Sequence, residues 1–532
     1  MIRAWSATDV RAAEEPLLAA GVPLMERAAF ALATTVLADL RARRRSVRGA
    51  HVVVLAGAGN NGGDALHAGA HLARRGLAVV AVLAAERVHD GGLAALRAAG
   101  GRTVDVASDA GRVRSVVHDV AGADVVLDGL VGIGACGPLR GTGGDVVRAL
   151  VADGLPGVPG DATGGPADHG PVTGRPWVVA VDVPSGIGVD DGTVPGPVLR
   201  ADRTVTFGAA KPGLLLPPAA HLVGDISVVD IGLHLAGAPA VRRLAAEDVA
   251  AAWPVPGPAD HKYTRGVVGV VAGTATYPGA AVLATTAAAR TGAGMVRYRG
   301  SDVVARAVLA ARPEVVTAPG RVQSWVVGPG VPPAADDADD GQTARGRAGL
   351  AAARGELAGL SRGPVPAVLD AGGLGLVEER CPPWFVLTPH AGELRTVLRR
   401  HGVDVHRADV EAEPLRWTRR AHELTGATVL LKGAVTVVVG PGVVYAQADA
   451  PAWLGTAGAG DVLAGILGAM LAGRAAAVVA DPALAAEVAA AAALVHGLAA
   501  ERATPGGPVT ALDVADAVPG TVADLLTLRA AP

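Results

Sequence analysis

The feature that most limits the fold of this chain is a repeated alternation of short β-branched runs, glycine-rich loops and helical segments. In the first example, the run His51–Leu55 precedes a glycine-rich loop and a helical pattern, Asp64–Arg75, which Gly76 closes. A second run, Val79–Leu83, completes a strand–helix–strand unit. The alternation therefore predicts an α/β architecture with mostly parallel sheets and with ligands at the carboxyl ends of the strands.

The alternation occurs in two passes, as expected for a chain of 532 residues, since single cores rarely exceed roughly 250–300 residues. We predict an N-terminal domain over 1–235 and a C-terminal domain over 259–532, joined by a proline-containing linker over 236–258. Two segments rich in polar residues or in glycine and proline, 153–176 and 336–347, are predicted to be loops. The other predicted strands are Val125–Leu127, Trp177–Val181, Thr204–Phe207, Ile226–Val229, Val267–Val271, Val315–Val316, Trp325–Val327, Ala367–Leu369, Phe385–Leu387 and Val429–Leu431.

Charge and cysteine content exclude several kinds of partner. The formal net charge is −3, so neither nucleic acid nor an anionic membrane is expected as a main partner. The chain has two cysteines, which indicates a protein built without disulfides, as in a reducing compartment. The apolar segment Ala483–Ala500 contains Glu487 and His496 and is interpreted as a packed helix. We expect a cytoplasmic protein that forms a homo-oligomer.

The first candidate site is the loop after His51–Leu55, which reads GAGNNGGD over 57–64. Its glycines would let the backbone approach a ligand, and the following helix N-terminus would offer free N–H groups to a phosphate. Asn60 and Asn61 interrupt the usual dinucleotide fingerprint. A tight turn with Asp64 as the helix N-cap explains the same residues equally well, so this loop alone leaves the function open.

Two further loops strengthen the case for a site. Asp128 follows one predicted strand and precedes a second glycine-rich loop, and Asp182 follows another strand and leads into Ser185. The oxygens at these strand ends are of the type that can hold a hard cation beside a phosphate. A buried carboxylate such as Asp182 can also act as a general acid or base.

The second candidate site is the GAGD sequence at 458–461, which opens a predicted helix. Small residues there leave backbone N–H groups free to form an anion hole, and Asp461 can take a proton from a nearby hydroxyl. This is the arrangement for phosphoryl transfer to an alcohol, although an ordinary glycine-packed helix start is an equally good interpretation. Lys432 and Thr436 could meet a nucleotide phosphate, while His390 also has an interpretation as a capping or core residue.

Separated motifs of the first half, NNGGD, GIGACGPLRG, DVPSGI and FGAAKPGL, resemble the N-terminal domain of the hydrated-nicotinamide epimerases. The resemblance implies a Rossmann-like fold and interconversion of the R and S hydrates of NADH or NADPH at C6 of the ring, by loss and return of the hydroxyl or by ring opening. It implies a potassium ion held by Asn61, Asp128 and Ser185, and Asp182 as the catalytic residue. It implies substrate contacts by Asn60, Asn61, Gly62, Gly63, Asp64, Gly132, Ile133, Gly134, Ala135, Cys136, Gly137 and Pro138. Ile133 stands where the family often has threonine.

Motifs of the second half, HKYTRG, GAG (292–294), GPG (328–330), TPHAGE, KGAVT and GAGD, are similar to the ribokinase-like dehydratase for hydrated NADH and NADPH. The GAG sequence links a helix to a strand, where plain packing would also explain it. The similarity implies ADP, with magnesium, as co-substrate, AMP and phosphate as products, and Asp461 as the base. It implies hydrated-cofactor contacts by Ala293, Gly330 and His390, and nucleotide contacts by Lys432, Gly433, Ala434, Val435, Thr436 and Gly460. Two departures stand out: Ala459 replaces a frequent threonine, and Gly372 replaces a frequent aspartate that could bind magnesium.

Together the two resemblances identify the chain as a member of a bifunctional family that repairs hydrated nicotinamide cofactors, in which the epimerase feeds the S hydrate to the dehydratase. One alternative is a ribokinase-like kinase for a vitamin precursor with a non-catalytic N-terminal binding module. The epimerase-like half and the TPHAGE and KGAVT segments argue against it. A purely scaffolding half would be expected to lack Asp182 or Asp461, and both are present.

Overall fold

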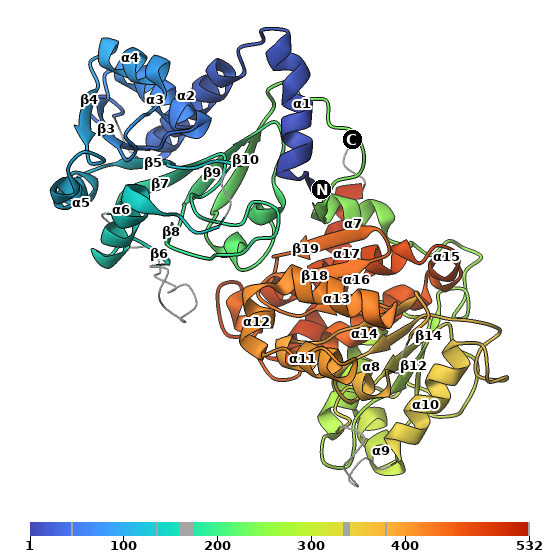
Figure 1. The fold of residues 1–532 in the computed structure, drawn as a ribbon. Coiled ribbons are helices and arrows are strands. Elements are labelled where there is room, and N and C mark those ends of the chain that lie inside the picture. The colour runs from blue at the N-terminus through green and yellow to red at the C-terminus, as the bar shows by residue number, and fades with distance from the viewer. Residues whose placement is uncertain (44–45, 135–136, 159–174, 333–340, 378–379, 530–532) are drawn as a thin grey trace. The chain divides into compact units, whose positions relative to one another are not determined.

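The structure is a computed structural model that describes residues 1–43, 46–134, 137–158, 175–332, 341–377 and 380–529. The chain divides into two compact units (Figure 1). The N-terminal unit is Arg3–Ala240, and the C-terminal unit is Val241–Pro532 together with Met1–Ile2. Each unit has a sheet with helices packed against it, as the alternation of strands and helices predicted.

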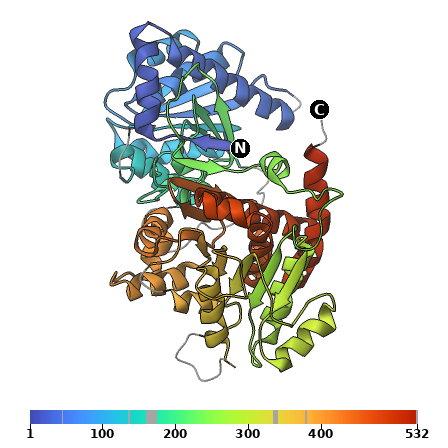
Figure 2. The ribbon, with the colours of Figure 1, turned by 90° about the vertical axis from the view of Figure 1, so that its right-hand side faces the viewer.

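The N-terminal unit is built on a parallel sheet with the strand order β10-β9-β7-β5-β2-β3-β4. Successive strand residues point to opposite faces. Val52 and Val54 therefore pack with helices α2 and α3, whereas Val53 and Leu55 pack with α5 and α6, so helices cover both faces (Figures 1 and 2). The elements are α1 (Ala7–Ala19), α2 (Leu24–Arg43), β2 (His51–Ala56), α3 (Asn60–Ala73), β3 (Ala78–Leu83), α4 (Asp90–Ala98), β4 (Arg102–Asp105), α5 (Val113–Ala121), β5 (Val125–Gly129), α6 (Gly141–Ala152), β6 (Gly157–Val158), β7 (Trp177–Val181), β8 (Val198–Leu199), β9 (Arg203–Phe207) and β10 (Asp225–Val229).

The sheet of the C-terminal unit has the order β1-β11-β19-β18-β17-β16-β15-β14-β12-β13. The strands from β13 to β17 pair in parallel, and β17, β18 and β19 pair antiparallel. Val326 packs with α8, α14 and α16, whereas its neighbour Trp325 packs on the other face beside Gly349 of α10. The elements are β1 (Ile2–Ala4), β11 (Val241–Arg243), α7 (Ala246–Ala252), β12 (Val267–Val271), α8 (Pro278–Arg290), β13 (Met295–Tyr298), α9 (Asp302–Ala311), β14 (Ser324–Val327), α10 (Gln342–Ala353), β15 (Ala367–Leu369), β16 (Phe385–Leu387), α11 (Ala391–Arg400), α12 (Arg407–Ala412), α13 (Pro414–Thr425), β17 (Thr428–Leu431), β18 (Thr436–Gly440), β19 (Val443–Gln447), α14 (Ala459–Ala472), α15 (Ala475–Ala480), α16 (Ala483–Ala503) and α17 (Ala511–Arg529).

Helix α16 is long and apolar enough to cross a membrane by length and composition. However, 78% of its most apolar window is buried inside the structure, where its alanines pack in the core of the C-terminal unit. The interpretation as a packed helix agrees with this burial. Small side chains allow the close approach of α14 and α17 that this core requires.

Two local predictions are wrong. Val315–Val316 forms no strand, and only Val316 makes an isolated bridge, to Arg297. The predicted loop over 336–347 contains the start of α10, which begins at Gln342. The buried side chain of Gln342 donates hydrogen bonds to the carbonyl oxygens of Ala272 and Gly273, at 2.9 and 2.7 Å, and this fixes the start of the helix. Polar composition alone gives no sign of such a buried amide.

Two other predicted segments carry regular structure. The segment 153–176 contains the short strand β6, which pairs with β8, although residues 159–174 lie outside the described ones. The segment 236–258 contains the strand β11 and the helix α7.

Candidate active sites

In the N-terminal unit, three loops leave the carboxyl ends of the adjacent strands β2, β5 and β7. The backbone N–H of Ser185 donates to Oδ2 of Asp128 at 2.8 Å, and the N–H of Val131 donates to Oγ of Ser185 at 3.0 Å. The side-chain amide of Asn61 donates to the carbonyl of Val131 at 3.0 Å. The structure thus brings together Asn61, Asp128 and Ser185. Burial raises the pKa of Asp128, and hydrogen bonds from Ser185 partly offset this effect.

Close packing explains the glycines of the first loop. A Cβ at Gly57 would lie 1.8 Å from the carbonyl oxygen of Leu130, and one at Gly62 would lie 2.2 Å from that of Gly57. Gly59 is the N-cap of α3, which begins at Asn60. The prediction that the helix starts at Asp64, and the alternative with Asp64 as N-cap, are therefore wrong. The helix therefore includes Asn60 and Asn61 in its first turn.

The second glycine-rich loop is described only in part, because Ala135 and Cys136 lie outside the described residues. Gly132 packs against Asn61, since a Cβ at position 132 would lie 3.1 Å from the Cβ of Asn61. The guanidinium of Arg11 donates to the carbonyl of Ile133 at 2.5 Å. Helix α1 therefore supports this loop, a contact that the sequence reasoning missed.

Asp182 lies at the end of β7 in a left-handed backbone conformation, with φ 65°. Its Oδ1 accepts hydrogen bonds from the Thr206 hydroxyl at 3.0 Å and the Phe207 N–H at 3.2 Å. The same oxygen forms an ion pair with the ammonium of Lys211. Lys211 is only 1% exposed. A strained aspartate that is held this firmly is typical of a functional site.

Sequence reasoning quoted Lys211 within FGAAKPGL but gave it no role. The sequence does contain a signal for its role, because Lys211 stands in an otherwise apolar run after a predicted strand. A lysine that is buried in such a run needs a carboxylate partner. Its partner, Asp182, lies 29 residues away in sequence, so the pairing itself could not be deduced.

In the C-terminal unit, the carboxyl ends of β15, β16 and β17 carry a charged cluster. The ammonium of Lys432 lies 2.7 Å from Oδ1 of Asp370 and 3.6 Å from Glu393, and Thr388 donates to the same Oδ1 at 2.8 Å. Burial lowers the pKa of Lys432, but the charges of Asp370 and Glu393 outweigh it and leave the pKa raised. The ammonium is therefore a fixed positive charge at this edge of the sheet.

Helix α14 points its N-terminus at this cluster. Gly458, with φ 86°, makes the turn into the helix. A Cβ added at Gly460 would lie 3.3 Å from the ammonium of Lys432 and 4.0 Å from Oδ2 of Asp370. Burial and the charge of Asp370 raise the pKa of Asp461 to about 7, although Lys432 opposes the shift. As predicted, Asp461 lies in the first turn, beside the free N–H groups.

His390 is the N-cap of α11, as its alternative interpretation allowed. Its Nδ1 accepts the N–H groups of Gly392 and Glu393, at 3.0 and 3.3 Å. The side chain remains 56% exposed, so capping does not exclude contact with a ligand. A backbone bridge joins His390 to Lys432, which places it in the same cluster. The predicted nucleotide segment follows, and its Thr436 begins β18.

The two remaining predicted contacts, Gly330 and Ala293, fall on different edges of the sheet. Gly330, after β14, has φ 64°, and a Cβ there would lie 2.4 Å from the Cβ of Ala280. Ala293 instead precedes β13, where the next residue, Gly294, donates to the carbonyl of Gly266 before β12. This is the amino edge of the parallel sheet, opposite Asp461. The structure therefore does not bring Ala293 together with Asp461, whereas Gly330 packs against Ala280 at the N-terminus of α8.

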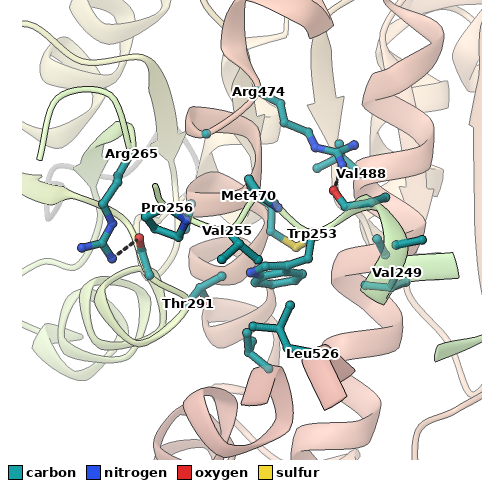
Figure 3. A pocket seen from close by; sticks show the side chains of 18 of the residues that line it. Val249, Trp253, Val255, Pro256, Arg265, Thr291, Met470, Arg474, Val488 and Leu526 are labelled. Carbon is teal, nitrogen blue, oxygen red and sulfur yellow. Dashed lines mark hydrogen bonds between the residues drawn. The ribbon is translucent and has the colours of Figure 1, made fainter. Parts of the chain in front are cut away.

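A cavity of about 530 Å³ lies in the C-terminal unit, but it is not where the catalytic candidates lie (Figure 3). Its walls include Trp253, Met470 and Leu526, and it extends to Gly473, just past the C-terminus of α14. Arg265 at its rim donates to the carbonyl of a neighbouring residue, Gly292. None of Asp370, His390, Lys432 or Asp461 lines it.

The fold and the two clusters define the class of protein. Each unit has a glycine-containing helix N-terminus beside a buried or half-buried aspartate, at the carboxyl edge of a parallel sheet. Helix N-termini at strand carboxyl ends are the usual binding places of phosphate-bearing ligands. The chain is thus a two-domain α/β protein of the class that binds such ligands.

Comparisons with known proteins identify the family. Residues 21–213 match the family described as YjeF-related protein N-terminus, and residues 268–518 match the NAD(P)H-hydrate dehydratase family. The bifunctional NAD(P)H-hydrate repair enzyme of Mycobacterium tuberculosis is 42% identical over 485 residues, covering 88% of this chain and 89% of its own. The NAD(P)H-hydrate epimerase of Clavibacter michiganensis is 47% identical over 243 residues, covering 45% of this chain and 94% of its own. The chain belongs to the family of bifunctional NAD(P)H-hydrate repair enzymes.

Solved structures align with the second half. The ADP/ATP-dependent NAD(P)H-hydrate dehydratase of Bacillus subtilis is 23% identical with a TM-score of 0.43, covering 53% of this chain and 97% of its own. A ribokinase-like superfamily protein of Enterococcus faecalis is 19% identical with a TM-score of 0.45, covering 54% and 96%. The predicted α/β fold with largely parallel sheets is confirmed by the structure. The epimerase and dehydratase activities are confirmed, and the alternative of a vitamin-precursor kinase is not favoured.

Proposed function

We propose that epimerisation takes place at the loops around Asn61, Asp128 and Asp182, and that dehydration takes place at Asp461. The observation that carries the second assignment is a carboxylate in the first turn of α14, next to the Lys432–Asp370 ion pair. A phosphate would meet the helix N–H groups and the ammonium while the carboxylate meets the substrate hydroxyl. The match of residues 268–518 to the dehydratase family supports the assignment.

In the proposed dehydration, Asp461 takes the proton of the C6 hydroxyl. The hydroxyl oxygen bonds to the β-phosphorus of ADP as the bond from that phosphorus to the AMP oxygen breaks. The phosphate then leaves C6 with the C–O electron pair, and loss of a proton from C5 restores the ring double bond. The products are AMP, phosphate and NADH or NADPH.

We propose ADP as the nucleotide, bound by Gly460 and the segment Lys432–Thr436. The protein residues do not form a magnesium cage, because Asp370 is paired with Lys432 and Gly372 offers no carboxylate. Among the residues that the structure describes, no group of three or more His, Cys, Asp or Glu is placed so that it could hold a metal ion. Magnesium is therefore proposed only as the counter-ion of the nucleotide phosphates, which is its common mode of binding.

A mixture of the R and S hydrates is the direct test of the proposed function. With ADP we expect the reduced-nicotinamide absorbance to return for the whole mixture, because the epimerase converts R to S as S is consumed. With ATP at the same concentration we expect a slower return, and without nucleotide none beyond the enzyme-free control. Recovery that stops at the S fraction would contradict the epimerase, and recovery without nucleotide would contradict phosphoryl transfer.

For the epimerase half we propose a bound potassium ion. Asn61 uses its amide nitrogen on Val131, which leaves its amide oxygen available beside Ser185 and the buried Asp128. One carboxylate among neutral oxygens suits a hard cation of low charge. A bound cation would also offset the free-energy cost of burying the charge of Asp128. The residues present therefore fit the ion, which would order the loops around the substrate phosphates.

Exchange of potassium for choline tests this ion. In the absence of nucleotide, we expect R-to-S conversion, followed by chromatography, to fall roughly tenfold and to recover when potassium is restored. A D128N variant should be insensitive to the exchange. Equal rates in both salts for the unmodified chain would contradict the potassium site.

We also propose a cytoplasmic location, since the cofactors to be repaired and ADP are cytoplasmic metabolites. The homo-oligomeric state stays a prediction, which light scattering on the purified chain would test.

A further inference from the structure

A second carboxyl group lies in the epimerase site near Asp182. Asp64 is in the second turn of α3, and part of its side chain is exposed, but its Oδ1 is shielded from solvent and has no hydrogen-bond partner. The charges of Asp182, Glu14 and Lys211 all act on Asp64, so these side chains lie near it. A shielded carboxyl oxygen without a partner is costly, so a functional reason is needed.

The two carboxyl groups have opposite environments. Burial raises the pKa of Asp64 well above its ordinary value, the negative charges of Asp182 and Glu14 raise it further, and Lys211 offsets only part of this. Asp182 instead accepts three hydrogen bonds on Oδ1, one of them from the buried ammonium of Lys211. The site thus pairs a shielded carboxyl group whose environment favours its proton-bearing form with a carboxyl group that faces three donors, and two such unlike groups can take separate acid and base roles.

Inversion at C6 needs both roles. A hydroxyl must leave one face of the ring as water, which requires a proton, and water must add to the other face, which releases one. We propose that Asp64 is the second catalytic residue of the epimerase: it protonates the departing hydroxyl, and Asp182 receives the proton of the water that adds. This inference rests on the proposed placement of the epimerase site.

The proton and electron balance of this scheme closes. The Asp64 carboxyl proton goes to the C6 hydroxyl oxygen, the C6–O bond breaks with its electron pair on the leaving water, and the ring nitrogen lone pair forms a double bond to C6. A water oxygen then bonds to C6 from the other face, the double-bond pair returns to nitrogen, and the water proton goes to Asp182. One proton has moved from Asp64 to Asp182, and the reverse turnover, or exchange with solvent, returns it.

The test uses the full chain without nucleotide, so that no hydrate is dehydrated, and follows R-to-S conversion by chromatography. Asp64→Asn keeps the shape of the side chain but cannot donate a carboxyl proton, and we expect conversion to fall on the order of 10²-fold or more. The reaction of the S hydrate with ADP should be unchanged in the same protein, and the Tm of the N-terminal unit should match that of the unmodified chain, which shows that this unit is folded. Conversion within threefold of the unmodified chain would overturn the proposal.

Glu14→Gln is the matched control, because the charge of Glu14 acts on Asp64 but Glu14 is given no proton to transfer. We expect the rate of R-to-S conversion at the pH plateau to stay within a few-fold of that of the unmodified chain. Since the charge of Glu14 raises the pKa of Asp64, its removal should shift the loss of activity at high pH toward lower pH. The other charges that act on Asp64 are those of Asp182 and Lys211, and Arg11, on α1, acts on Glu14. A profile that does not move in Glu14→Gln, or no loss at high pH in the unmodified chain, would contradict Asp64 as the acid.

Labelled water distinguishes the two routes to inversion. In H₂¹⁸O we expect one solvent oxygen at C6 of each inverted molecule, beyond the enzyme-free exchange, and retention of the original oxygen would overturn the proposal. An unmodified chain that shows no epimerisation at all would instead refute the placement of the epimerase site.

Discussion

A chain in which asparagine replaces Asp461 is expected to lose dehydratase activity by on the order of 10³-fold, because the amide cannot take the hydroxyl proton. Asparagine matches the aspartate in size, and the entry into α14 depends on the left-handed Gly458 rather than on this side chain. The helix should therefore remain intact. The measurement is ADP-dependent return of reduced-nicotinamide absorbance from purified S hydrate.

Two controls make this result specific. Epimerisation by the same variant should match that of the unmodified chain. Asp302→Asn changes an exposed aspartate in the first turn of α9, another helix of this unit, and should leave dehydration within a factor of two. A dehydration rate of Asp461→Asn within a few-fold of the unmodified chain would remove Asp461 from the role of base.

The pH dependence of the unmodified dehydratase gives an independent check. Burial, with the charge of Asp370, raises the pKa of Asp461 to about 7. A base acts in its ionised form, so kcat/KM should be half of its plateau near pH 7 and should fall tenfold per pH unit well below that. Activity that is flat between pH 5 and 8 would contradict this assignment.

The central strands could be predicted from the sequence because they are buried on both faces and are therefore continuous apolar runs, as in Val267–Val271. Edge elements carry weaker signals. Strand β4 has no fully buried residue, so it lacks the apolar run of a central strand. Strands β18 and β19 form a hairpin, but a short run of valines such as the one after KGAVT is compatible with either a strand or a buried helix. The start of helix α10 was missed because the amide that anchors its first turn bonds to backbone far away in sequence.

The candidate sites show the same division between local and distant signals. Asn61, Asp461 and the glycines around them could be found because short motifs place them at helix starts. The ion pairs Asp182–Lys211 and Asp370–Lys432 depend on strand order, which no motif specifies. The GAG sequence around Ala293 shows the same limit, because it suits a loop at a ligand and also a tight connection between a helix and a strand, and only the topology separates the two.

Asp182→Asn is expected to lower R-to-S conversion on the order of 10²- to 10⁴-fold, since the amide accepts no proton, while dehydration of S hydrate stays intact. Asparagine tolerates the left-handed conformation at this position. It leaves the buried Lys211 without its carboxylate, however, which costs about 3–5 kcal/mol in the free energy of unfolding. A loss of activity in this variant alone could therefore reflect damage to the N-terminal unit.

The double variant Asp182→Asn with Lys211→Met separates chemistry from stability. Removing both charges leaves no buried ion unpaired, so the Tm of the N-terminal unit should rise back toward that of the unmodified chain. Conversion of R to S hydrate should nevertheless stay at the level of the single variant, because no carboxylate has returned. If the double variant regained both its Tm and its epimerase activity, Asp182 would be a structural partner of Lys211, and proton transfer at C6 would have to be assigned to another group in the pocket.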